Sequence, residues 1–238
     1  MTDTSAVLQI DELQVHYADG VHALRGVSLS VRAGERVGLI GPNGAGKTTL
    51  MLSIMNAVRF RGRIAVDGIE VRKKSEHEAR SRCGMIFQNA DDHLFMPTLL
   101  DDVAFGPLNQ GCEAAEAQRR ASEAIAQVGL AGLEQRSAHH MSGGQMRAAA
   151  LATVLAMQVK LLLLDEPAAN LDNRSRHRLI EMLDGRSEAM LLATHDLPLV
   201  RRLCSRVIVM DQGQIVADGP TDRLLNETVL LRAHGLVD

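Results

Sequence analysis

The stretch VGLIGPNGAGKT, residues 37–48, joins a short apolar segment to a glycine-rich turn that ends in Lys-Thr. Its apolar part, residues 37–40, is typical of a buried strand, and residues 47–55 beyond the turn have the pattern of a helix. The turn, residues 41–48, follows the spacing G-x-x-x-x-G-K-[ST]. A strand, a glycine-rich turn and a helix in this order predict a loop whose backbone N–H groups wrap a polyphosphate.

The residue types in this loop indicate how it would bind its ligand. We expect the Lys47 ammonium to lie between the β- and γ-phosphates and the Thr48 hydroxyl to contact Mg²⁺. A plain glycine turn followed by a chance Lys-Thr pair is the alternative, and the flanking strand and helix argue against it. The residues expected to bind the nucleotide here are Gly41, Pro42, Asn43, Gly44, Ala45, Gly46, Lys47, Thr48 and Thr49.

A second apolar segment, LLLLDE at residues 161–166, ends in two carboxylates. Ligands of α/β sheets bind at the carboxyl ends of the strands, so both acids are expected near the phosphate loop. Asp165 is placed to hold Mg²⁺ through water, and Glu166 to orient and polarise the attacking water. Two solvated acids after a strand are the alternative.

The tetrapeptide SGGQ at residues 142–145 opens a predicted helix. Ser142 is a good N-cap, and Gly143 and Gly144 leave backbone N–H groups uncovered, which suits a second anion site. An ordinary helix start is the alternative. Two phosphate sites on one chain make sense if two protomers stack head-to-tail and each completes the other's site.

Along the rest of the chain, strand patterns alternate with helical patterns. The expected fold is therefore α/β, with a mainly parallel sheet covered on both faces. Apolar and polar side chains alternate over residues 7–17 and 27–31, which predicts strands, and the pattern of residues 63–71 predicts a hairpin. Between about residues 99 and 158 the pattern becomes helical, which predicts an inserted α-helical lobe.

Composition excludes several classes of protein. The chain has 238 residues, is 46% hydrophobic and 2% aromatic, and has a net charge of -3. A nucleic-acid binder that acts without sequence preference would need basic and stacking side chains, so we expect no nucleic-acid partner. Three widely spaced cysteines fit free thiols better than a disulfide framework. No stretch of about 20 apolar residues is present, so no membrane span is expected.

Taken together, the motifs resemble the nucleotide-binding subunit of an ABC transporter, over about residues 6–235. The resemblance implies a P-loop NTPase (RecA-like) core with an N-terminal antiparallel β subdomain, the whole chain 1–238 forming a single ATPase domain. It further implies that Tyr17 stacks on adenine and that Gln88 meets Mg²⁺ and the attacking water. Asp172, in the segment ANLD, would lie across a dimer interface, and His195 would hydrogen-bond the γ-phosphate.

By this resemblance Glu166, His195 and Gln88 are the catalytic residues, and Thr48, Gln88 and Asp165 hold the metal. Each assignment taken from the resemblance has an alternative: Tyr17 as a surface strand residue, Gln88 as a strand cap, His195 as a buried structural histidine. Two further groups, His139-His140 and Asp91-Asp92-His93, are interpreted as solvated loop residues, since no regular spacing supplies a third metal ligand.

A narrower resemblance concerns residues 87–98 (FQNADDHLFMPT) and 101–109 (DDVAFGPLN), which are similar to the Q-loop region of energy-coupling-factor (ECF) ATPases, especially the cobalt/nickel-type A component. Met141, Ala148 and Ala149 depart from the common pattern around the SGGQ motif without removing a phosphate contact. The implied function is an importer ATPase that uses ATP and Mg²⁺ and powers uptake of cobalt, nickel or a vitamin.

The implied partners are a second ATPase, either an identical copy or a sister chain, an integral membrane transport (T) subunit and a substrate-binding membrane subunit. The chain would then be a peripheral protein at the cytoplasmic face of the inner membrane. Phe87, Phe95 and Phe105 bracket Gln88 and are expected to meet the membrane partner. Two alternatives remain: a non-transport soluble ABC ATPase, and a phosphate-loop kinase or GTPase-like switch, which would need no SGGQ motif.

Overall fold

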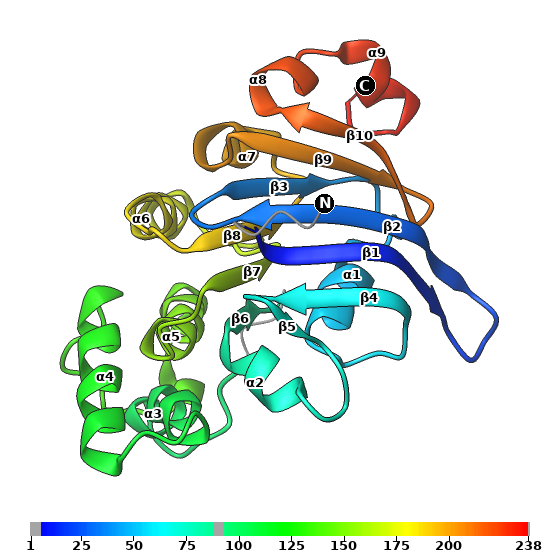
Figure 1. Ribbon diagram of the computed structural model, residues 1–238. Helices are drawn as coiled ribbons and strands as arrows, with labels where there is room; N and C mark the ends of the chain where they lie inside the picture. The colour runs from blue at the N-terminus through cyan, green and yellow to red at the C-terminus, as the bar shows by residue number, and fades with distance from the viewer. Residues whose placement is uncertain (1–5, 88–92, 238) are drawn as a thin grey trace. The chain divides into compact units, whose positions relative to one another are not determined.

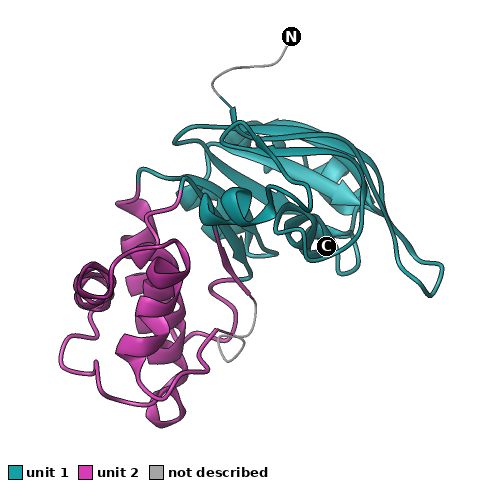
Figure 2. Ribbon diagram, turned by 60° about the horizontal axis from the view of Figure 1, so that its bottom comes forward, with its two compact units in different colours: residues 1–83, 160–166, 187–238 teal, residues 84–159, 167–186 magenta. Residues whose placement is uncertain are grey.

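The computed structural model describes residues 6–87 and 93–237, and its elements are labelled in Figure 1. Within those residues the chain forms two compact units (Figure 2). The first comprises residues 6–83, 160–166 and 187–237, so it is assembled from three stretches of chain. The second comprises the intervening stretches, residues 84–159 without the gap, and 167–186.

The first unit is built around a mainly parallel sheet in which strands occur in the order β10-β9-β3-β8-β7. The parallel strands are β3 (Arg36–Ile40), β7 (Leu161–Asp165), β8 (Ala189–Ala193) and β9 (Arg206–Asp211), and β10 (Gln214–Pro220) runs antiparallel to β9. Every residue of β7 and β8 is buried, as expected of strands covered on both faces. The remaining strand of this sheet, β6 (Cys83–Ile86), contains the point where the chain passes into the second unit.

An antiparallel sheet in the order β2-β1-β4-β5 completes the first unit. Its strands are β1 (Ala6–His16), β2 (His22–Arg32), β4 (Arg61–Val66) and β5 (Ile69–Glu70). Helix α1 (Lys47–Ile54) contacts β2 of this sheet and β7 of the parallel one, so it packs against strands of both sheets. The other helices of the unit are α2 (Glu76–Ser81), α7 (Leu197–Leu203), which contacts β3, α8 (Thr221–Leu224) and α9 (Thr228–Ala233).

The second unit is helical. Helices α3 (Leu99–Asn109), α4 (Ala114–Gln127) and α5 (Gly143–Ala156) contact one another, and α6 (Asn173–Asp184) belongs to the same unit. A short 3-10 turn at Ala138–His140 precedes α5. On α4, Ala117, Ala121, Ala124 and Ile125 are buried, as their helical spacing predicts.

Local signals in the sequence explain where several of these helices begin. Thr98, Ser142 and Asp172 are the N-caps of α3, α5 and α6, and each side chain accepts a hydrogen bond from a backbone N–H one turn later. The predicted fold class is confirmed: a mainly parallel sheet, an N-terminal antiparallel sheet and a helical insertion are all present.

Candidate functional site

The phosphate-loop motif lies between β3 and α1, at the carboxyl end of a parallel strand of the first unit. Gly46 has a φ of 102° and a Cβ there would lie 2.8 Å from the Ala23 carbonyl oxygen, so glycine is required both by conformation and by space. The Lys47 Nζ donates to the carbonyl oxygens of Gly41 at 2.7 Å and Pro42 at 3.0 Å. These two hydrogen bonds hold the ammonium group against the loop that is expected to bind the phosphates.

Thr48 and Asp165 meet beside this loop. The Thr48 hydroxyl donates to Asp165 Oδ2 at 2.7 Å, and the Asp165 carboxylate, at the end of β7, is buried. Burial raises the pKa of the Asp165 carboxyl above its ordinary value, which the hydrogen bond from Thr48 and the charge of Lys47 oppose. Hydroxyl and carboxylate oxygens are the donors that Mg²⁺ prefers, so the residues present fit this ion.

Burial also affects the lysine of the loop. It lowers the pKa of the Lys47 ammonium, and the negative charges of Glu166 and Asp165 act in the opposite direction. The buried Lys47 ammonium thus lies near two carboxylates, Asp165 at the end of β7 and Glu166 directly after it. Such a site favours a ligand that brings negative charge of its own, because phosphate oxygens restore the interactions that the ammonium loses to water.

Three polar groups of the segment after β8 contact the Glu166 carboxylate. Its Oε2 accepts from the Thr194 hydroxyl at 2.8 Å, and its Oε1 accepts from the His195 backbone N–H at 3.0 Å. The Nδ1 of the exposed His195 ring lies 2.8 Å from the same Oε1. Glu166 itself has a φ of 48°, a conformation uncommon outside glycine.

The parallel pairing of the strands produces this cluster. Asp165 of β7 is opposite Ala193 of β8, so the residues that follow each strand emerge side by side. The sequence predicted Glu166 and His195 as site residues but not their direct contact, and it did not identify Thr194. A usable signal was present, since Thr194 is the first polar residue after a strand that ends at the same edge.

Tyr17, predicted to stack on adenine, follows β1 and is 37% exposed. Its hydroxyl lies 3.1 Å from the Thr49 Oγ1 in the first turn of α1. The structure therefore brings the single tyrosine of the chain to the helix that follows the phosphate loop. Its ring retains an accessible surface, as a stacking residue requires.

The SGGQ motif lies in the second unit, at the start of α5. Ser142 and Gln145 form a capping box: the Gln145 N–H donates to Ser142 Oγ at 3.3 Å, and the Ser142 N–H donates to Gln145 Oε1 at 3.0 Å. Ser142 and Gly143 are exposed. At Gly144, an added Cβ would lie 2.5 Å from the Ser175 Oγ of α6, so only glycine allows this approach.

Asp172, predicted to face a dimer interface, caps α6. Its Oδ1 accepts from the Ser175 N–H at 2.8 Å, and its Oδ2 accepts from the Ser175 hydroxyl at 3.2 Å. These hydrogen bonds, the one from the backbone N–H first, lower the pKa of the Asp172 carboxyl. Gln88 lies outside the described residues, so its predicted role stays a prediction.

The two candidate metal groups noted in the sequence have other surroundings. His93 Nε2 accepts a hydrogen bond from the Phe87 N–H at 2.8 Å, while Asp91 and Asp92 lie outside the described residues. His139 and His140 are exposed in the turn before α5. Within residues 6–87 and 93–237, no group of three or more His, Cys, Asp or Glu side chains is arranged to hold a metal.

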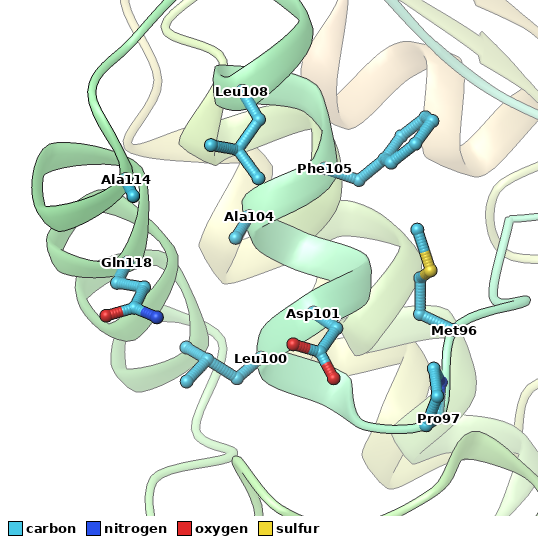
Figure 3. Close-up of a pocket in the computed structure, with 9 residues that line it drawn as sticks. All are labelled: Met96, Pro97, Leu100, Asp101, Ala104, Phe105, Leu108, Ala114 and Gln118. Atoms are coloured by element: carbon cyan, nitrogen blue, oxygen red, sulfur yellow. The ribbon is translucent and has the colours of Figure 1, made fainter.

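An open apolar groove of about 220 Å³ lies in the second unit, between the segment around Met96 and Pro97, α3 and the start of α4 (Figure 3). Phe105 borders it and packs edge-to-face with Phe95, with ring centroids 5.1 Å apart. Phe95 is 64% exposed. The buried Asp102 supports this segment, since its Oδ1 accepts from the N–H groups of Phe95 and Met96 at 2.9 Å each.

A transmembrane helix was not expected from the sequence. Among the described residues, no helix is both long enough and apolar enough to cross a bilayer.

Comparison with known proteins identifies the family of this chain. Residues 24–169 match the model of the ABC transporter family. The chain is 46% identical over 235 residues to a putative ABC transporter ATP-binding protein of Streptomyces coelicolor, covering 98% of this chain and 90% of the relative. It is 38% identical over 236 residues to the energy-coupling factor transporter ATP-binding protein EcfA of Methanocaldococcus jannaschii, covering 97% and 85%.

Among solved structures, CbiO1 of Clostridium perfringens, described as part of the ABC transporter complex CbiONQ, matches with a TM-score of 0.83. The sequence identity is 31%, and the match covers 98% of this chain and 95% of that one. Since the family match spans more than half of the chain and the relatives align along nearly all of it, the protein belongs to the ABC transporter family, as an ABC ATPase.

Proposed function

We propose that this chain is the ATPase of an ECF-type importer whose cargo is cobalt, nickel or a vitamin. The observation that carries the proposal is the cluster at the carboxyl ends of β3, β7 and β8, where Lys47, Thr48–Asp165 and Glu166–His195 meet within one unit. The similarity to a chain named as an energy-coupling factor ATPase, and to CbiO1, supports the importer class.

In this proposal the first unit binds ATP. The Lys47 ammonium moves from the carbonyl oxygens of Gly41 and Pro42 to the β- and γ-phosphates, which offer it stronger, charge-assisted hydrogen bonds. The backbone N–H groups of the loop and of the start of α1 would surround the same phosphates, apart from the Ala45 N–H, which donates to the Pro42 carbonyl oxygen at 3.1 Å. Tyr17, tied to Thr49, offers the face of its ring to adenine.

Thr48, Asp165 and Gln88 would hold Mg²⁺, and the bound ion supplies positive charge that offsets the charge developing on the phosphates. Glu166 would accept a proton from the attacking water. Thr194 and His195 fix both oxygens of its carboxylate, so the base is oriented before the substrate arrives. The His195 ring, being exposed, can reach a γ-phosphate while it remains next to Glu166.

The second unit would act on the ATP of a second ATPase, an identical copy or a sister chain. The start of α5, with the exposed Ser142 and the half-buried Gly144, would offer N–H groups and a hydroxyl to the γ-phosphate bound by the partner. Asp172 would lie across the same interface. Each ATP is then held between a phosphate loop and a SGGQ helix, and hydrolysis reopens the pair.

The membrane partner would dock on the second unit. The apolar groove beside α3, with Phe105 at its border and Phe95 next to it, suits an amphipathic segment of a membrane subunit (Figure 3). This docking would place the chain at the cytoplasmic face of the inner membrane as a peripheral protein. A transport subunit and a substrate-binding subunit complete the assembly.

The test is to purify this chain with the membrane subunits that bind it and to reconstitute the assembly in vesicles. We expect ATP-dependent uptake of radiolabelled Co²⁺ or Ni²⁺, or of a vitamin, that is lost with Glu166→Gln. The chain with Glu181→Gln, an exposed residue of α6 paired with His177, serves as the matched control and should support normal uptake. ATP hydrolysis by a chain that binds no membrane subunit would instead favour a non-transport ABC ATPase.

A further inference from the structure

Arg147, on α5, is a buried charged residue with 7% of its surface exposed. Its Nη1 donates to the carbonyl oxygen of Phe87 at 3.1 Å, and its Nη2 donates to the carbonyl oxygen of Ala169 at 3.4 Å. Burying a guanidinium is costly unless its N–H groups are hydrogen-bonded. Here the bonds go to two loops that are far apart in the sequence and belong to the same unit.

Each of these loops leads to a residue with an expected role in ATP hydrolysis. Phe87 immediately precedes Gln88, and Ala169 begins the segment that ends in Asp172. Arg147 itself comes two residues after Gln145, the last residue of the SGGQ motif. One side chain therefore joins the backbone of three segments that the sequence predicts to act on the nucleotide.

A second contact holds the same segment against α5. Asp172 caps α6 through Ser175, and the Ser175 Oγ packs against the backbone of Gly144. Gly144 and Arg147 are three residues apart on α5, so they face the same side of the helix. The stretch from Ala169 to Ser175 is thus fixed to α5 at both ends, by Arg147 at one end and by the close approach at Gly144 at the other.

We propose that Arg147 is a positioning residue for ATP hydrolysis. It fixes the carbonyl group before Gln88 and the carbonyl group of Ala169 relative to the SGGQ helix, so that the three segments move as one body when two ATPases close on ATP. A planar guanidinium serves this purpose because its donors point in fixed directions toward two acceptors, whereas a lysine ammonium is a single point of charge. The inference rests on the proposed two-chain mechanism of hydrolysis.

The experiment compares the steady-state ATPase kinetics of the full chain, in its assembly with the membrane subunits, for Arg147→Lys, Arg147→Met and Arg147→Ala. We expect kcat to fall by about 10–100-fold with KM for ATP nearly unchanged, because misplacement of catalytic groups by about 1 Å costs rates of this order. Arg147→Lys should restore little of the rate. Added guanidinium ion at non-denaturing concentration should partly rescue Arg147→Ala and not Arg147→Met, whose side chain fills the space.

Arg119→Ala is the matched control, since this arginine lies in the same unit and its ion pairs with Glu116 and Glu123 of α4 are exposed. It should leave kcat unchanged. A merely structural Arg147 would lower the unfolding temperature and the folded fraction, with the kcat of the folded molecules unchanged and no guanidinium rescue; that result overturns the inference. If the unsubstituted assembly fails to show hydrolysis that depends on Lys47 and Glu166, the proposed function itself is wrong.

Discussion

Two helix starts in this chain are expected to bind phosphate, and they are prepared in opposite ways. Helix α1 begins after Gly46, whose lack of a side chain leaves the first N–H groups without a capping side chain. Helix α5 begins after Ser142, whose hydroxyl already accepts from the Gln145 N–H within a capping box. The first residue of α1 is the buried Lys47, whereas Ser142 and Gly143 at the start of α5 are exposed.

The two helix starts are suited to different steps of ATP binding. An uncapped start beside a buried cation is arranged to bind a ligand strongly within its own unit. A self-capped, exposed helix start is stable without a ligand. It suits a phosphate that is bound to another chain, and we expect it to bind that phosphate less strongly. Substitutions should therefore affect ATP binding at the first start, and association at the second.

The largest effect on ATP hydrolysis is expected at Glu166, which follows β7 in the same unit as the uncapped start of α1. Glu166→Gln keeps an oxygen that can accept from the His195 N–H but removes the base, so hydrolysis should fall by about 10²–10⁴-fold while ATP binding is retained. ATP should then trap two chains together, which size-exclusion chromatography detects. Glu181→Gln makes the same chemical change at an exposed position of α6 and should have no effect. Full turnover by Glu166→Gln would remove this residue from the mechanism.

Lys47→Ala tests the uncapped start directly. Loss of the ammonium removes charge-assisted hydrogen bonds to the phosphates, and the Kd for ATP should rise by about 10–100-fold. Titration calorimetry measures it, with Lys73→Ala, an exposed lysine, as the control. An unchanged Kd would mean that the loop binds ATP without its lysine, and the contrast between the two helix starts would fail.

Ser142 separates capping from phosphate binding at the second start. Ser142→Ala should lower the free energy of unfolding by about 1 kcal/mol through loss of the cap. Ser142→Asp keeps a capping oxygen at a helix N-terminus, so stability should stay near that of the unsubstituted chain. Its negative charge should nevertheless repel a γ-phosphate and abolish ATP-dependent pairing, measured in the Glu166→Gln background.

Thr98→Ala supplies the matched control for these two variants, because Thr98 caps α3 in the same unit. It should lower stability and leave pairing intact. If Ser142→Asp pairs as well as the unsubstituted chain, the start of α5 serves only as a helix cap.

How far the sequence leads differs between the two units. In the first unit, apolar runs such as residues 161–166 and 189–195 indicate buried parallel strands that are followed by polar residues. The strands, the position of the phosphate loop and the acids at the strand ends could therefore be predicted. The contact between Glu166 and His195 could not, because it depends on which strands are neighbours in the sheet. Nothing local in the sequence says that β7 pairs with β8.

In the second unit, the helices and the Ser142 cap were predictable from local patterns. The role of Arg147 could not be predicted, because an arginine two residues after a glycine motif is normally a solvent-exposed helix residue. Its burial and its two carbonyl acceptors follow from how α5 packs against loops that the sequence places far away. Such contacts are set by tertiary packing, which local patterns do not encode.

A smaller effect is expected in the second unit at Phe95. Phe95→Ala should weaken assembly with the membrane subunits, because an exposed aromatic ring beside an apolar groove is a typical anchor for a partner segment. The Kd for ATP should be unchanged, which co-purification and calorimetry on the same preparation can establish. Val229→Ala, at an exposed apolar position of the first unit, is the control and should assemble normally. A loss of ATP affinity with assembly intact would reverse the interpretation.

The last prediction concerns the reactivity of the three free thiols, which differ in burial between the two units. Burial raises the pKa of Cys83 and of Cys204, both in the first unit, to about 12, so each stays protonated and inaccessible near neutral pH. Cys112, in the second unit, is half-buried. A maleimide reagent at pH 7.5 should therefore label the folded chain once, at Cys112, and three times after denaturation, as intact mass spectrometry counts. Rapid labelling of Cys83, next to the point where the chain enters the second unit, would show that β6 opens in the native state.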